Sequence, residues 1–155
     1  GDPKLRIGET HNPETHLIPS IIRNSLSKKN KSFEVFGDNF KTSDGFAIRD
    51  YLNVIDISSA FKKGMFWLLN NQGHNIFNLG SNKGFSVKQI INECEIVIKK
   101  SINYKIKPRR KGEPDYLLSD ISKATNVLKW KPKYSTIGEI IKTSYLWQSK
   151  IFKDE

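Results

Sequence analysis

The chain has 155 residues, a hydrophobic fraction of 37% and a formal net charge of +10 at pH 7, from 26 Lys and Arg against 16 Asp and Glu. This length suits one domain with its own core, and the 9 Phe, 5 Tyr and 3 Trp exclude a chain too polar to fold. A single cysteine, Cys94, excludes a disulfide framework. No apolar run reaches transmembrane length and the polar N-terminus predicts no signal peptide, so we expect a cytoplasmic protein with Cys94 as an inert core residue.

The positive charge invites nucleic acid as a partner, but its distribution argues against one. The lysines are scattered, and only two short basic clusters stand out, at 28–31 and 107–111. Abundant Lys, Asn and Ile together indicate a general bias in residue usage. We therefore expect a solvated lysine surface, with no nucleic-acid groove and no membrane contact.

The first predicted elements are a helix and a strand. Residues 17–26 carry apolar side chains at helical spacing, and Pro19 falls in the first turn, where its missing N–H does no harm. Thr15 is the expected N-cap of this helix. Residues 32–36 predict a short strand that ends at Gly37.

The next stretch holds the most informative arginine. Turn chemistry at 43–45 precedes Arg49, which stands before an apolar run, and Asp56 is the expected N-cap of a helix over 56–71. An arginine held beside a packed segment suits bidentate recognition of phosphate, while the alternative is a surface arginine paired with Asp50. The helix is expected to bury one apolar face made of Ile57, Phe61, Met65 and Leu68 and widened by Phe66, Trp67 and Leu69.

Two more strands and a helix follow. Residues 75–79 predict a strand. Ser86 with Gln89 forms a capping box that begins a helix. Residues 103–107 alternate apolar and polar side chains, which predicts a half-buried strand with Ile106 on its apolar side.

Two helices complete the order. Asp120 is the expected cap of a short helix, and Thr136 with Glu139 forms a second capping box before the last one. Strands alternating with helices predict an α/β fold. The strands are few and short, so the long apolar helix faces predict a partner that this chain does not contain.

Four features predict a common anion site. The helix that begins at Leu17 offers N-terminal N–H groups, and Arg49 and Arg110 offer guanidinium groups. Phe36 ends a strand and could present a flat surface to a base, and Glu113 could accept hydrogen bonds from a sugar diol. Each feature alone has a plainer interpretation, in which Phe36 is core and Glu113 a solvated loop carboxylate. Together they favour a nucleotide-diphosphate site.

The sequence lacks the motifs of several other activities. It has no Gly-x-Gly-x-x-Gly and no Walker loop. The three histidines show no metal-ligand spacing with Cys94, so we expect no metal site. The sequence therefore offers binding residues without an evident catalytic base, and no catalytic residue is assigned to it.

Several segments together resemble one family. The chain is similar, over essentially its whole length, to the C-terminal half of bacterial UDP-glucose 4-epimerases, which are extended short-chain dehydrogenases/reductases. The narrower motifs are Glu-Thr-His-Leu-Ile-Pro at 14–19 and Pro-Arg-Arg-Lys-Gly-Glu-Pro at 108–114. The broader ones are Arg-Asp-Tyr at 49–51, Asn-Leu-Gly at 78–80 and Ser-Lys-Ala at 122–124.

The resemblance implies a fold and a function. Residues 1–155 would be one C-terminal substrate-binding domain, with edge elements of a Rossmann-like sheet and without the N-terminal NAD-binding part. The function would be the UDP-sugar-binding portion of an NAD-dependent isomerase of galactose and nucleotide-sugar metabolism, acting on UDP-glucose and UDP-galactose. NAD, the Gly-rich loop and the Tyr-x-x-x-Lys pair would belong to the missing half, so we expect the chain alone to be inactive.

The resemblance also implies roles for single residues. The backbone at His16 and Leu17 would meet the diphosphate, and Arg49 with Arg110 would clamp it. Glu113, where the family usually has Asp, would bind the ribose hydroxyls. Val35 and Phe36 would flank the uracil, and Leu117 would lie near the hexose.

Three alternatives stay open. One is a related reductase on another nucleotide sugar, such as a UDP-glucuronate epimerase or decarboxylase. Another is a stand-alone basic module that binds nucleotides or nucleic acid. For the assembly, a homodimer and association with the missing N-terminal half are both open.

Overall fold

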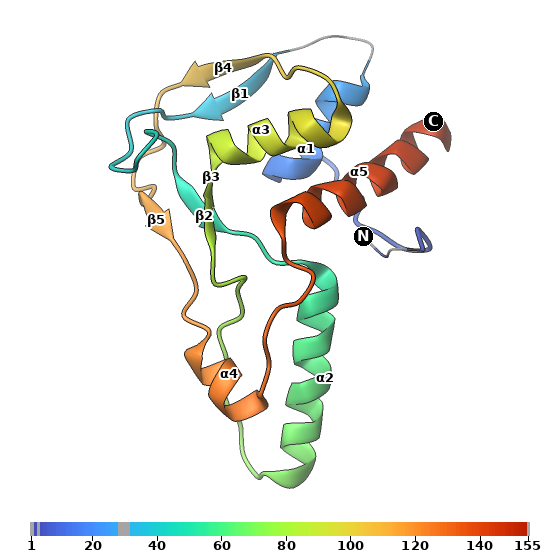
Figure 1. Cartoon of the computed structure of the whole chain (residues 1–155), viewed down its shortest axis with the longest axis vertical. Coiled ribbons are helices and arrows are strands. Elements are labelled where there is room, and N and C mark those ends of the chain that lie inside the picture. Colours follow the sequence, from blue (N-terminus) through green and yellow to red (C-terminus); the bar gives the residue numbers. More distant parts are fainter. Residues whose placement is uncertain (1, 3, 28–31, 155) are drawn as a thin grey trace.

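Five helices and two small sheets make up the part of the chain that the computed structural model describes, which is residues 2, 4–27 and 32–154 (Figure 1). In chain order the elements are α1 (Leu17–Leu26), β1 (Phe33–Phe36), β2 (Ile48–Asp50), α2 (Val54–Asn70), β3 (Gly84–Ser86), α3 (Val87–Ile98), β4 (Tyr104–Lys107), β5 (Tyr116–Leu117), α4 (Ser122–Leu128) and α5 (Ile137–Asp154). This alternation confirms the α/β class. The basic cluster at 28–31 lies outside the described residues.

The two sheets are short and use few strands. β1 pairs with β4 in parallel, with Val35 opposite Ile106. β2 is the centre of the other sheet, where it pairs with β3 in the antiparallel sense and with β5 in parallel. β2 therefore fixes the positions of β3 and β5, two segments that come much later in the chain.

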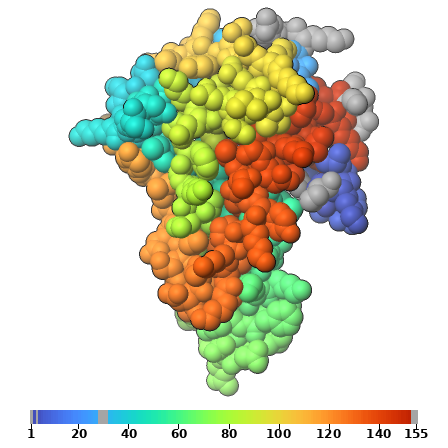
Figure 2. Space-filling view, viewed as in Figure 1, coloured from blue at the N-terminus to red at the C-terminus, as the bar shows by residue number. Residues whose placement is uncertain are grey.

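Two hydrophobic clusters hold the elements together at opposite ends of the molecule. The larger one lies among α1, α3, α5 and β1, and it includes the fully buried Ile21, Ile90 and Ile141. Cys94 belongs to this cluster, as expected, and burial raises the pKa of its thiol to about 12. The smaller cluster joins α2 and α4 around Trp130, and the C-terminal half of α2 projects at that end (Figure 2).

The helix ends show where local chemistry succeeds and where it fails. The capping box at Ser86 and Gln89 is confirmed at the start of α3. The expectation for Thr15 is wrong, because α1 begins after His16, which makes no side-chain cap hydrogen bond. The expectation for Asp56 is also wrong: α2 begins two residues earlier, and the side chain of Asn53 accepts the hydrogen bond from the N–H of Ile55 at 3.0 Å.

Three expectations about burial and strands are wrong for a common reason. Residues 75–79 form no strand, Ile106 is exposed, and so are most members of the expected apolar face of α2, namely Phe61, Met65, Phe66, Leu68 and Leu69. A strand needs a neighbour for its backbone hydrogen bonds, and an apolar face needs a surface to pack on. The described residues supply neither at these places.

Asp56 has a different role, as a buried anchor between α2 and the segment before α5. Its carboxylate accepts hydrogen bonds from the N–H groups of Lys133 and Tyr134, at 2.9 and 2.8 Å, and from the hydroxyl of Ser135 at 2.6 Å. Its backbone carbonyl accepts one from the indole of Trp130 at 3.1 Å. A single side chain thus joins the start of α2 to the chain that leads into the last helix.

We expect Asp56→Ala to lower the free energy of unfolding by about 3 kcal/mol, because it leaves donors in a buried site without an acceptor. Urea unfolding at neutral pH measures this. Asp38→Ala is the control, because Asp38 is exposed, and it should change the free energy of unfolding by less than about 0.5 kcal/mol. Equal effects of the two substitutions would contradict the anchor role.

Candidate functional site

A cavity of about 410 Å³ lies among the start of α1, strands β1 and β2, and the loop after β4. Of the eight residues that the sequence singles out, six line it: Leu17, Val35, Phe36, Arg49, Arg110 and Glu113. They come from four separate segments, so the fold gathers them. The cavity shares none of its lining residues with a second hollow of about 480 Å³, which lies along α2 beside Phe61 and Leu68.

The two arginines are held in different ways. Arg49 lies on β2, where its guanidinium donates to the carbonyl of Ile48 at 2.8 Å and to the Oε1 of Glu113 at 2.9 Å. Its partner is therefore Glu113 and not the adjacent Asp50, whose carboxylate accepts hydrogen bonds from Ser81. Arg110 places its guanidinium 4.1 Å from the ring centre of Phe36, in a cation–π contact. Both cationic groups are thus positioned before any anion arrives.

Only one of the two carboxylate oxygens of Glu113 has a hydrogen-bond partner among the described residues. Oε1 pairs with Arg49, whereas Oε2 is buried and has no hydrogen-bond partner among the described residues. A buried carboxylate oxygen without a donor is costly, so this atom is suited to accept a hydrogen bond from a ligand.

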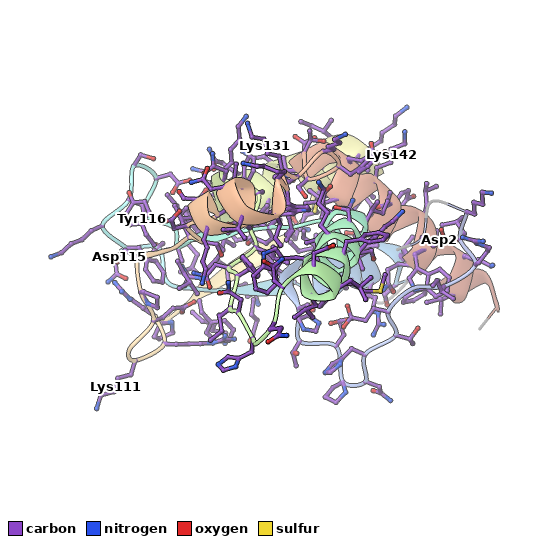
Figure 3. All side chains as sticks on the ribbon, turned by 90° about the horizontal axis from the view of Figure 1, so that it is seen from below. Asp2, Lys111, Asp115, Tyr116, Lys131 and Lys142 are labelled. Atoms are coloured by element: carbon purple, nitrogen blue, oxygen red, sulfur yellow. The ribbon has the colours of Figure 1, made fainter. Side chains whose placement is uncertain are left out.

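Arg109 stabilises the loop that carries Glu113. Arg109 pairs with Asp115 at 3.0 Å, donates to the carbonyl of Glu113, and lies 4.1 Å from the ring centre of Phe40. Gly37, at φ +84°, lets the chain pass here, because a Cβ would lie 2.5 Å from that ring. Lys111, at the tip of the same loop, points away from the rest of the molecule (Figure 3). In the basic cluster at 107–111, Arg109 therefore has a structural role, Arg110 lines the cavity and Lys111 is exposed to solvent.

The start of α1 is fixed by an acidic residue that the sequence interpretation overlooked. Glu14 also lines the cavity, and its side chain is only 6% exposed. Its Oε1 accepts from the backbone N–H of His16 at 3.0 Å and lies 3.0 Å from the Nδ1 of the same residue, while its Oε2 lies 3.5 Å from the guanidinium of Arg23. The only local signal for this role is its place in the Glu-Thr-His motif.

The segment before α1 is held in place by the last helix. The indole of Trp147 donates to the carbonyl of Glu9 at 2.9 Å, and the ammonium group of Lys150 donates to the carbonyl of Leu5 at 2.7 Å. Arg23 donates to the carbonyl of His11 and to the side chain of Gln148, at 3.0 and 2.9 Å. Helices α1 and α5 thus set the path by which the chain reaches the cavity.

Tyr51 is a second lining residue that the sequence interpretation did not assign a role. It follows β2 and is largely buried, and burial raises its pKa to about 12, although the nearby Arg49 acts in the opposite direction. The phenol therefore stays neutral at physiological pH and remains a hydrogen-bond donor.

Two predicted site residues do not line the cavity. His16 is the N-cap of α1, and its half-exposed ring lies against the carboxylates of Glu9 and Glu14. Leu117 is exposed on β5, where it is the register partner of Arg49. Both are next to lining residues in the chain or in the sheet, and their predicted contacts stay predictions.

The described residues do not form a site that fits a dinucleotide cofactor. β1 ends at Phe36, and Gly37 leads into a loop and not into a helix, while β2 passes into α2 through residues 51–53, which contain no glycine. A dinucleotide needs a Gly-rich turn that leads from a strand into a helix. Within residues 2, 4–27 and 32–154 there is also no cluster of metal ligands, and no helix there has the length and apolar character needed to cross a membrane.

Comparison with known proteins connects this geometry to one family. The family model described as GDP-mannose 4,6 dehydratase matches residues 7–143. The UDP-glucose 4-epimerase of Halalkalibacterium halodurans is 38% identical over 149 residues, which are 96% of this chain and 44% of that protein. The enzyme of the same name from Lactobacillus helveticus is 40% identical over 91% of this chain and 42% of its own length.

A solved structure gives the same result for the fold. The UDP-glucose-4-epimerase of Stenotrophomonas maltophilia, crystallised with NAD and formylated UDP-arabinopyranose, superimposes with a TM-score of 0.92 at 28% identity, over 99% of this chain and 46% of that one. The chain matches the C-terminal portion of such structures, so the resemblance and the fold are confirmed. It spans less than half the length of the relatives it matches.

We expect the free energy of unfolding to fall as the pH rises from about 10 to 12, with Tyr51→Phe removing about 1–3 kcal/mol of that fall. The folded chain keeps the phenolic proton to a pKa of about 12, whereas the unfolded chain loses it near 10.0. The stabilising effect is complete below the lower value and disappears as the pH passes the higher one.

The free energy of unfolding of the unsubstituted chain and of Tyr51→Phe is measured with denaturant near pH 8 and near pH 11. The effect of lysine titration is common to both proteins, so it cancels when the two pH-dependent changes are subtracted. Cys94→Ala is the companion variant, since the pKa of Cys94 is also raised to about 12, and it should remove a separate part of the fall. An identical pH dependence in Tyr51→Phe and the unsubstituted chain would show that Tyr51 is not buried in this way.

Proposed function

The chain belongs to the GDP-mannose 4,6 dehydratase family, and from that premise we propose that it is the UDP-sugar-binding portion of a UDP-glucose 4-epimerase. In this proposal residues 1–155 form one substrate-binding domain. The observation that carries it is the cavity that brings Arg49, Arg110 and the spare oxygen of Glu113 to the start of α1. Two guanidinium groups suit a diphosphate, and a carboxylate suits a diol.

Each part of the nucleotide has a proposed partner. The diphosphate lies between the two guanidinium groups and the backbone N–H groups at His16 and Leu17, where α1 begins without a side-chain cap. The ribose hydroxyls donate to the Oε2 of Glu113, the oxygen without another partner. The uracil lies along Val35 and Phe36 at the end of β1, and the hexose extends toward Leu117 on β5.

Binding and orientation are all that we assign to this chain. UDP-glucose and UDP-galactose are the proposed substrates, and epimerisation is proposed only for a longer protein that also binds NAD. The sequence contains no Tyr-x-x-x-Lys pair and no Gly-x-Gly-x-x-Gly, so no catalytic step is derived from its residues. We expect the isolated chain to be inactive for that reason.

The expected result of titrating UDP into the chain by calorimetry is saturable binding. Arg49→Ala and Arg110→Ala should each weaken it by about 10- to 100-fold, because each removes charge-assisted hydrogen bonds to the diphosphate. Arg6→Ala is the control for charge, since Arg6 pairs with Asp2 and does not line the cavity. Circular dichroism shows whether each variant is folded.

Two results would contradict the proposal. One is a folded chain that binds no UDP at millimolar concentration. The other is steeply salt-dependent binding to random DNA that UDP does not displace, which is the behaviour of a basic nucleic-acid-binding module.

A second prediction separates the ribose contact from the phosphate contact. Glu113→Ala should weaken UDP binding by about tenfold or more relative to inorganic pyrophosphate, because pyrophosphate has no diol to donate to a carboxylate. Loss of the carboxylate also frees Arg49, so pyrophosphate should bind at least as well as before. Equal losses for the two ligands would assign Glu113 a purely structural role.

A further inference from the structure

A hollow of about 720 Å³ lies between α2 and the segment that leads from α4 toward α5. Four of the residues that line it are lysines, namely Lys63, Lys129, Lys131 and Lys133. We call it the lysine hollow. It shares no lining residue with the cavity around Arg49 or with the hollow beside Phe61. Its volume is in the range of sites that hold small organic ligands.

The sequence Lys-Trp-Lys-Pro-Lys at 129–133 supplies three of the four lysines. Trp130 is fully buried in the smaller hydrophobic cluster, and its indole donates a hydrogen bond to the carbonyl of Asp56. This side chain anchors the segment to the protein. The lysines on either side of Trp130, and Lys133 beyond them, remain exposed.

Helix α2 forms the facing wall of the lysine hollow. Asp56, Ser59 and Lys63 are three and four positions apart, which places them on one side of the helix. The ammonium group of Lys63 donates to the carbonyls of Leu128 and Lys129 at 3.3 and 2.9 Å, where α4 ends. These hydrogen bonds connect the two walls.

The positive charge in the lysine hollow has little compensation. Its only acidic lining residue is Asp56, whose carboxylate already accepts three hydrogen bonds. Among the described residues no carboxylate forms an ion pair with a lysine of the hollow, whereas Lys107 pairs with Glu34 elsewhere on the surface. Four ammonium groups and a single carboxylate therefore line one depression, which attracts anions.

We propose that the lysine hollow binds an anion that carries a chain of phosphate groups. Lysine binds phosphate as a point charge on a flexible stem, so it imposes no fixed geometry on the ligand. Several lysines around one hollow therefore suit a ligand with several negative charges better than a single phosphate group. The cavity around Arg49 has a different chemistry, because its guanidinium groups are held in place by Glu113 and Phe36.

The phosphate chain has two possible sources, an inorganic polyphosphate and the triphosphate of a nucleotide, and Tyr134 distinguishes them. This residue lines the lysine hollow and is 50% exposed, while its backbone N–H donates to Asp56 at 2.8 Å. An exposed ring offers a surface on which a base can stack. A nucleotide source predicts that ATP binds more tightly than inorganic triphosphate and that Tyr134→Ala removes the difference. An inorganic source predicts equal affinities.

The test is an NMR titration of the isotope-labelled chain with sodium triphosphate at constant ionic strength, because salt screens exposed charges. Backbone amides within residues 125–134 should shift and reach saturation. Amides at 110–113 report the cavity around Arg49, so the two sites are observed separately. Inorganic monophosphate should bind the lysine hollow at least about tenfold more weakly, because it carries fewer charges.

Substitutions that remove one charge decide whether these lysines are responsible. Lys131→Gln and Lys133→Gln should each weaken triphosphate binding by about threefold to tenfold, whereas Lys131→Arg keeps the charge and should retain the affinity. Lys142→Gln is the matched control, at an exposed lysine of α5 outside the hollow, and should change the affinity less than about twofold. Each substituted side chain is exposed, so the fold should persist, and the amide spectrum shows whether it does.

Three results would overturn the inference. One is a folded chain in which millimolar triphosphate shifts no amide within residues 125–134. Another is an equal loss of affinity in Lys142→Gln and Lys131→Gln, because net charge alone would then attract the ligand. The third is tighter binding of a hexaglutamate peptide than of triphosphate, which would assign the hollow to an acidic protein segment. UDP binding is followed at other amides, so this inference and the proposed function can fail separately.

Discussion

The pairing of β2 on both of its edges is the constraint on which the rest of the molecule depends. β2 has only three residues, yet it joins β3 on one side and β5 on the other. Its middle residue, Arg49, faces the cavity, and Asp50 holds Ser81 and the backbone N–H of Ser119 at 2.8 and 3.3 Å. One short strand therefore fixes the cationic side of the cavity and leads into Tyr51 and Leu52, which pack against the larger and the smaller hydrophobic cluster respectively.

Electrostatic pairing stabilises the partly buried charges around the cavity. Partly buried charges are costly unless they are paired, and here Arg49 has Glu113 while Glu14 has Arg23. Arg110 is exposed and lies over the ring of Phe36, which attracts its guanidinium group. Two of the arginines near the cavity are thus paired with carboxylates, which distinguishes them from the scattered lysines that account for most of the positive charge of the surface.

Local chemistry is enough to predict α1, the start of α3 and the set of residues that converge on the cavity. These depend on helical periodicity, a capping box and the chemistry of the arginines and Glu113, all of which the sequence displays directly. The roles of Asp56 and Glu14 depend on partners far away in the chain or on a fold-back of the backbone, and the sequence gives no signal for Asp56 and only the Glu-Thr-His motif for Glu14. The prediction of a strand at 75–79 is wrong for another reason. Its sequence pattern is typical of a strand, but no described segment lies beside it to pair with its backbone.

The support that α5 gives to the segment before α1 has a consequence for the order in which the site can assemble. The hydrogen bond from Trp147 to Glu9 spans 138 positions of the sequence, and the one from Lys150 to Leu5 spans 145. A ribosome produces the residues of α1 before those of α5, so the segment before α1 lacks this support until α5 has been synthesised. The cavity therefore reaches its final form only after α5 has emerged, and its completion closes one of the longest loops in the chain.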